Sequence, residues 1–122
     1  MVDFKPLDES FPIEKQLGVE TGPVVLVNIF TVDAEDQDAL LAAWQNDALF
    51  MKKQPGYIST QLHKAVGASS MYFNYAIWES VSHFRSAFSH PEFQNALSHY
   101  PSSAVTAPHL FEKIAVGDCC TA

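Results

Sequence analysis

The stretch with the strongest pattern in the chain is residues 71–80, MYFNYAIWES. Aromatic and β-branched residues dominate it and small or polar residues flank it, which predicts a β-strand. Because side chains alternate across a strand, its residues divide into two faces. These faces are Tyr72, Asn74, Ala76 and Trp78 on one side, and Phe73, Tyr75 and Ile77 on the other. Neither face suits water, so we expect both to be covered.

An earlier strand and a helix are predicted upstream. Residues 23–32, PVVLVNIFTV, are an almost continuous apolar run interrupted by Asn28, which is typical of a strand buried on both faces. A helix should follow from a cap at Asp33 to about Lys53. Its predicted apolar stripe is Leu40, Leu41, Trp44, Ala48 and Met51. The sequence Gln-Pro-Gly at 54–56 then ends the helix.

The remaining elements complete a recognisable order. Residues 57–66 predict a strand that pairs with residues 71–80 as an antiparallel hairpin. Residues 80–100 predict a helix capped by Ser80 and broken at Pro91, 101–108 a loop, and 109–116 the last strand. The order β-α-β-β-α-β is the ferredoxin-like plan of the α+β class. It has a four-stranded antiparallel sheet with both helices on one face.

The face of this sheet that the helices leave open predicts a second protein chain packed against it. The two central strands are apolar on both sides, yet both helices cover the same side, so we expect a homodimer that packs sheet against sheet. The chain divides into an extended N-terminal arm at 1–22, a domain at 23–117 and a tail at 118–122. The arm should lie over the domain or over a partner subunit.

Composition narrows the classes of function. The formal net charge of -7 argues against nucleic acid and against an anionic membrane surface as partners. There is no apolar stretch of membrane-spanning length and no signal-like N-terminus. The two cysteines, Cys119 and Cys120, are adjacent in the tail, which favours a reduced, cytoplasmic protein. No histidine spacing predicts a metal site, and no glycine-rich loop predicts a nucleotide or flavin, so we expect no cofactor.

The candidate chemistry lies in polar groups set among aromatic residues. The amide of Asn74 and the indole N–H of Trp78 share a face and could stabilise an oxyanion, or could form a hydrogen-bonded core pair. Asn28 should converge on them from the neighbouring strand. His63 could serve as a general base, or could be a partly exposed strand histidine. Tyr72, Phe84 and Phe88 could bind a flat aromatic substrate, or could belong to the core.

Three segments together resemble a known family. They are the first strand with its asparagine, the turn PGY at 55–57 and the run NYAIWESVSHFRSAFSHPEF at 74–93. They resemble the antibiotic biosynthesis monooxygenase family of dimeric α+β barrels over about residues 24–116. In anthrone-oxidising members, an asparagine and a tryptophan four residues later on the third strand line the pocket. Asn74 and Trp78 match that spacing.

The resemblance implies a cofactor-independent monooxygenase that oxidises a small aromatic phenol, quinol or anthrone with dioxygen. The alternative is a non-catalytic dimeric module of the same fold that binds a small ligand. Phe84 and Ser98 stand near the positions of the family's downstream tyrosine and arginine, which favours this alternative. Haem degradation is not expected, because Ala87 and Leu97 occupy two positions of the haem-degrading pattern.

Overall fold

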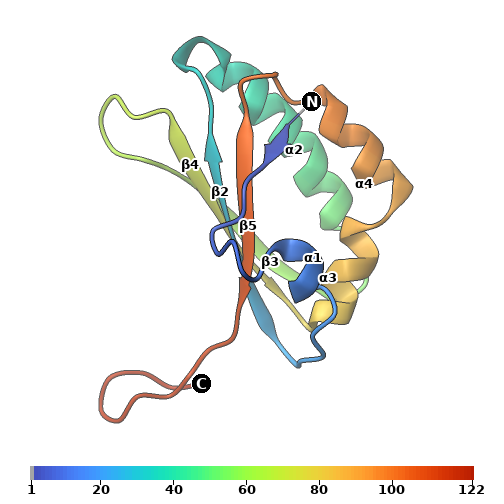
Figure 1. Cartoon of the computed structure of the whole chain (residues 1–122), viewed down its shortest axis with the longest axis vertical. Coiled ribbons are helices and arrows are strands. Elements are labelled where there is room, and N and C mark those ends of the chain that lie inside the picture. Colours follow the sequence, from blue (N-terminus) through green and yellow to red (C-terminus); the bar gives the residue numbers. More distant parts are fainter. Residues whose placement is uncertain (1) are drawn as a thin grey trace.

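The computed structural model describes residues 2–122. It is an α+β fold with one five-stranded sheet in the order β1-β5-β2-β4-β3. The strands are β1 (Asp3–Phe4), β2 (Val24–Thr31), β3 (Tyr57–Lys64), β4 (Met71–Trp78) and β5 (Val105–Phe111). The helices are α1 (Ile13–Gln16), α2 (Gln37–Met51), α3 (Val81–Phe88) and α4 (Pro91–Ala96), with short 3-10 turns at Ala34–Asp36 and Leu97–His99. Helices α2, α3 and α4 all lie on one side of the sheet (Figure 1).

The predicted fold class is confirmed, and the two most apolar strands are the central neighbours. β2 and β4 pair antiparallel over their full length, with Asn28 directly opposite Asn74. Directly opposed residues point to the same face, so both amides project toward the helices. The strand count differs from the four expected, because β1 adds a fifth strand.

β1 brings the N-terminal arm onto the domain. It pairs parallel with β5 through Asp3↔Val105 and Phe4↔Thr106. The side chain of Val2 is 4% exposed, and its backbone nitrogen donates to Leu97 O at 3.5 Å. The start of the arm therefore covers the gap between the sheet edge and the helical layer.

The last strand begins earlier than predicted, and Pro108 lies inside it. The prediction placed a loop at 101–108, since proline usually interrupts a sheet. Backbone groups of alternate residues point to the same strand edge, and Thr106 O accepts from Lys5 N on the β1 edge at 2.8 Å. Pro108 therefore points to that edge, past the end of β1, where no N–H is needed. The next N–H there, that of Leu110, donates to Gln16 Oε1 at 2.7 Å.

A bulge in β3 turns Tyr57 toward the helices. The pairing with β4 shifts between Tyr57 and Ser59, so Tyr57 joins the face of Thr60 and not that of His63. Tyr57 then packs edge-on against Trp78, with ring centroids 5.6 Å apart. The irregularity thus adds one aromatic ring to the helix-covered face.

Local sequence signals position the helices as predicted in several places. Ser80 caps α3, because its side chain accepts from His83 N, and Pro91 stands in the first turn of α4. Before β3, Gly56 adopts φ +84°, and a Cβ there would lie 2.2 Å from Cγ of His83. The turn therefore needs glycine both for its backbone conformation and for the close approach of α3.

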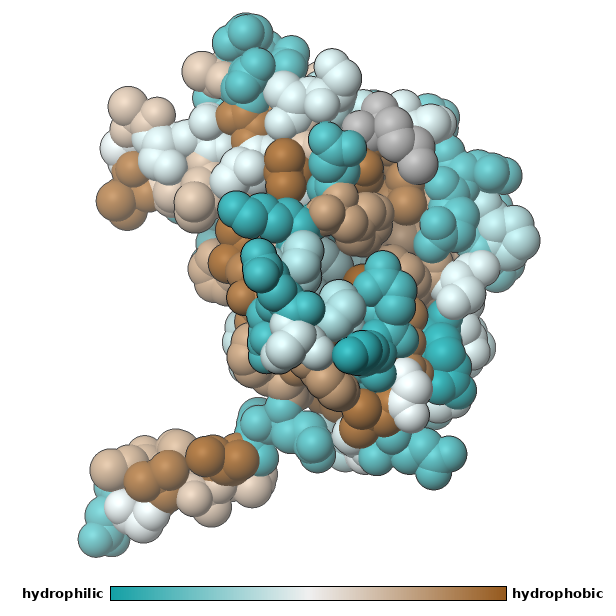
Figure 2. All heavy atoms as spheres, in the orientation of Figure 1, coloured by the Kyte–Doolittle hydropathy of each residue, from teal (hydrophilic) through white to brown (hydrophobic). Residues whose placement is uncertain are grey.

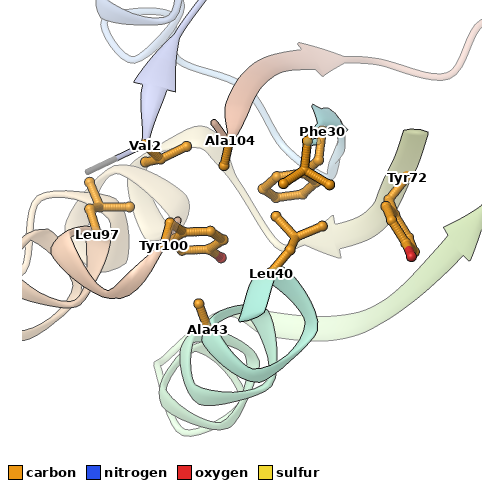
Figure 3. Packing of buried hydrophobic residues seen from close by; sticks show 9 residues of the cluster. Val2, Phe30, Leu40, Ala43, Tyr72, Leu97, Tyr100 and Ala104 are labelled. Atoms are coloured by element: carbon orange, nitrogen blue, oxygen red, sulfur yellow. The ribbon is translucent and has the colours of Figure 1, made fainter. Parts of the chain in front are cut away.

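The core lies between the sheet and the helices. Figure 3 shows one part of it, where Phe30, Leu40 and Tyr100 meet under the N-terminal arm. The rings of Phe30 and Tyr100 stack with centroids 6.1 Å apart. A second cluster surrounds Trp78, which is 1% exposed.

The other side of the sheet and the C-terminal segment carry exposed apolar side chains. On the open face, Tyr75 is 38% exposed, and the unpaired bulge residue Ile58 at the start of β3 is 50% exposed. The segment after β5 projects from the body of the molecule with apolar surface (Figure 2), including Ile114 at 70% exposure. Within residues 2–122, no helix has both the length and the apolar character needed to cross a bilayer.

Candidate functional site

A cavity lies between the helix-covered face of the sheet and the helices. The centre of a water molecule can range over about 70 Å³ inside it, which is room for several waters. Strands β2, β3, β4 and β5 form its floor, α2, α3 and α4 form its walls, and the N-terminal arm closes it with Val2 and Phe4. Most of the lining is apolar. The aromatic lining residues are Phe4, Phe30, Trp44, Tyr57, Trp78, Phe84, Phe88, Phe93 and Tyr100.

Polar side chains cross the cavity floor in one row. Thr106, Asn28, Asn74 and Thr60 come from β5, β2, β4 and β3 in that order. The hydroxyl of Thr106 donates to Oδ1 of Asn28, and the hydroxyl of Thr60 donates to Oδ1 of Asn74. Each threonine thus fixes the oxygen end of one amide.

The nitrogen ends of these amides have no acceptor among the described residues. Among residues 2–122, neither Nδ2 of Asn28 and Asn74 nor the indole N–H of Trp78 makes a hydrogen bond to protein atoms. All three residues line the cavity. Donors that line an apolar cavity without a protein partner suit a guest that presents an oxygen atom.

Most of the residues predicted for the site are brought together. Asn28, Asn74, Trp78, Phe84 and Phe88 all line the cavity. The aromatic rings of Tyr57 and Phe93 line it too.

Tyr72 and His63 are placed elsewhere. Tyr72 shares the face of Asn74 but lies at the far end of β4, where its hydroxyl donates to Gln37 Oε1 at 2.7 Å. His63 pairs with Phe73 across β3 and β4, and their rings stack 4.3 Å apart on the open face of the sheet. The sheet therefore separates His63 from the cavity of its own chain, and it does not reach a substrate bound there.

Asp47 is a cavity residue that the sequence reasoning missed. It lies on α2, is 6% exposed and lines the cavity. The Tyr100 hydroxyl is its hydrogen-bonding neighbour, and within residues 2–122 no basic side chain forms an ion pair with its carboxylate. Burial raises the pKa of Asp47 to about 6, and the Tyr100 hydroxyl and the charge of His99 oppose that rise.

A signal for Asp47 was present in the helical spacing. It stands seven residues after Leu40, three after Trp44 and four before Met51, which are inward-facing positions of α2. The predicted stripe included Leu40, Trp44 and Met51 but not Asp47, and it also included Leu41, which is 38% exposed.

The site therefore combines three N–H donors with one carboxyl group in an apolar enclosure. Donors fixed before a substrate arrives stabilise developing negative charge on oxygen, and they do so best where water is excluded. A carboxyl whose pKa lies near the working pH can exchange a proton with a substrate. Within residues 2–122, no three or more metal-binding side chains cluster as a metal site would need.

Comparison with known proteins places the chain in a family. The antibiotic biosynthesis monooxygenase family matches residues 23–98. No curated protein sequence matched the chain. A putative monooxygenase from Shewanella loihica PV-4 is similar, with 33% identity, a TM-score of 0.67, and 81% of this chain and 100% of that chain covered. SnoaB, a cofactor-independent oxygenase from Streptomyces nogalater, is also similar in fold, with 23% identity and a TM-score of 0.71. The match covers 80% of this chain and 99% of that chain. The family match and the 33% identical relative together show that the chain belongs to the antibiotic biosynthesis monooxygenase family.

Proposed function

We propose that the protein is a cofactor-independent monooxygenase that oxidises a small aromatic phenol, quinol or anthrone with dioxygen. The observation that carries this proposal is the set of unpartnered donors, Asn28 Nδ2, Asn74 Nδ2 and Trp78 N–H, in a cavity walled by aromatic rings. The rings suit a flat apolar substrate, and the donors suit the oxygen atom that becomes negative when the substrate loses a proton.

The chemistry balances with dioxygen as the only co-reactant. Loss of a proton from an anthrone-type CH₂ gives a carbanion whose charge is shared with the ring oxygen. The carbanion transfers one electron to dioxygen, and the two radicals combine into a peroxide at that carbon. The peroxide takes a proton, and loss of water leaves a carbonyl. One oxygen atom enters the product and the other leaves as water, while the donors hold the negative oxygen throughout.

The test is oxygen uptake with a panel that rises from hydroquinone through naphthohydroquinone to anthrone. We expect wild-type uptake above the buffer rate, and a loss of about 10²–10³-fold in kcat when Asn74→Ala and Trp78→Phe are combined. Gln45→Ala, an exposed amide on α2, is the matched control and should keep the wild-type rate. Binding of these compounds without turnover would instead support the ligand-binding module, and the oxygenase proposal would be wrong.

The same proposal includes a homodimer formed through the open face of the sheet. Exposed Tyr75 and Ile58 lie on or beside this face, and the projecting segment with Ile114 adds further apolar surface. A second copy is the occupant that covers both regions at once, because each chain presents the same apolar sheet to the other. Dioxygen and the aromatic substrate would enter each cavity separately from this interface, since the cavity lies on the other side of the sheet.

A further inference from the structure

Asp47 stands in the wall between the buried cavity and a groove on the outer surface. It lines the cavity together with Asn74 and Trp78. It also lines the outer groove between α2 and α4, together with Lys53, Glu92 and His99. Asp47 therefore lies where a proton could pass from a bound molecule toward solvent.

The surroundings of Asp47 do not resemble those of a structural carboxylate. Buried carboxylates are normally paired with a cation or held by hydrogen bonds. Asp47 is 6% exposed, the Tyr100 hydroxyl is its hydrogen-bonding neighbour, and within residues 2–122 no basic side chain forms an ion pair with it. An acid kept in this state carries a cost to stability, and such a cost is often retained where the group has a chemical task.

The charged and titratable groups around Asp47 are few. The Tyr100 hydroxyl and His99 act on its carboxylate, and both lower its pKa, although burial dominates and raises it. Lys53 and Glu92 face it only from the outer groove. Burial also raises the pKa of Tyr100, and the nearby Asp47 raises it further, so Tyr100 stays protonated and does not compete as a base.

We propose that Asp47 is the catalytic base, which takes the proton from the substrate's acidic C–H or O–H and passes it to solvent through the outer groove beside His99. This assignment rests on the proposed function, because it supplies the first step of that reaction. The bond broken is the substrate C–H or O–H, and its electron pair stays on the substrate. The bond formed is the O–H of the neutral Asp47 carboxyl. The later protonation of the peroxide can use the same carboxyl in reverse.

Proton abstraction can be measured separately from oxidation. Anthrone is incubated with the enzyme in D₂O without oxygen, and the exchange of its CH₂ protons is followed by NMR. We expect wild type to accelerate this exchange, and Asp47→Asn to lower the acceleration by about 10²–10⁴-fold, the range for loss of a general base. Asp38→Asn, an exposed acid in the first turn of the same helix, should exchange at the wild-type rate.

Two further readouts exclude a purely structural role. The rate in wild type should rise with pH through the Asp47 pKa of about 6, because only the ionised carboxylate accepts a proton, and this rise should be absent in Asp47→Asn. Asp47→Glu, which restores a carboxyl group, should recover part of the rate even if it lowers the melting temperature. If the exchange rate recovers in Asp47→Glu but not in Asp47→Asn, the loss of rate is due to the missing carboxylate and not to a folding defect.

The outcomes distinguish the two proposals. Exchange that depends on Asp47 without oxygen uptake would support the base and overturn the oxygenase. Oxygen uptake by wild type with an unchanged rate and pH profile in Asp47→Asn would overturn the base and leave the oxygenase in place. Absence of both exchange and uptake in the wild type would overturn both.

Discussion

At the scale of single residues, two threonines decide which way the asparagine amides face. Thr60 and Thr106 donate to the Oδ1 atoms of Asn74 and Asn28, which leaves each Nδ2 without a protein acceptor among residues 2–122. We expect Thr60→Val to lower kcat about fivefold with little change in KM, since one hydrogen bond of about 1 kcal/mol then no longer holds the amide. Thr60→Ser keeps the hydroxyl and should keep most of kcat. Equal losses in both variants, measured by oxygen uptake, would show that packing and not the hydrogen bond matters.

The buried Asp47 should also appear in the pH dependence of stability. Its pKa is raised from 3.8 to about 6 in the folded state, so the folded protein binds a proton that the unfolded chain releases. Protonation of Asp47 therefore favours folding. This contribution to the free energy of unfolding is complete below the pKa of the unfolded chain and is lost as pH rises through the pKa of the folded protein. We expect the stability of Asp47→Asn relative to wild type to increase by up to about 3 kcal/mol between about pH 4 and about pH 7. Urea unfolding of both proteins across this pH range measures the difference in their free energies of unfolding. A difference that does not change with pH would contradict the prediction.

The sequence predicted the asparagines of this site but not its acid, for a physical reason. Strand alternation is strict, so Asn74 and Trp78 had to share a face, and the apolar run around Asn28 had to be central. A carboxylate on a helix, by contrast, is rarely buried, and sequence reasoning places it on the wet side of the helix. Only the packing of α2 against the sheet shows that Asp47 faces inward.

At the scale of elements, the turn between α2 and β3 depends on a glycine that another helix approaches. Gly56 and Gly67 both have positive φ, but a Cβ at Gly56 would meet His83, whereas a Cβ at Gly67 would meet nothing within 4 Å. We expect Gly56→Ala to destabilise the protein by about 2 kcal/mol more than Gly67→Ala, because only Gly56→Ala adds overpacking to the backbone strain. Chemical denaturation of the pair measures this difference. Similar losses in both variants would show that backbone strain alone sets the requirement.

Several element boundaries followed from the sequence, but the last strand, predicted at residues 109–116, is Val105–Phe111 in the structure. Pro108 predicted a loop, because proline usually interrupts a sheet. β5 nevertheless accommodates it, because the Pro108 nitrogen points past the end of β1 and has no strand to pair with there. The bulge in β3 leaves no trace in the hydrophobic pattern, yet it moves Tyr57 into the cavity. The pairing register of β3 and β4 likewise places His63 opposite Phe73, on the open face. The pattern of β3 alone does not show which of its faces the helices cover.

At the scale of the whole molecule, the sheet has one covered face and one open face, and the open face supports the proposed dimer. We expect Tyr75→Asp to convert a dimer into a monomer, because it places a charge in the middle of the apolar face. Val66→Asp, at a loop position that is 92% exposed, is the control and should leave the dimer intact. Light scattering coupled to gel filtration gives both masses. A monomeric wild type, or a dimer unaffected by Tyr75→Asp, would contradict the proposed interface.

The covered face holds the central claim, that the donors of Asn28, Asn74 and Trp78 are kept for a bound aromatic molecule. The most direct measurement is a titration of ¹⁵N-labelled protein with anthrone in the absence of oxygen, followed at the side-chain N–H resonances. The account predicts that the amide signals of Asn28 and Asn74 and the indole signal of Trp78 shift together as anthrone saturates. The exposed amides of Asn46 and Asn95 should not move. Cavity signals that stay fixed at saturation, or exposed amides that shift as far, would contradict it.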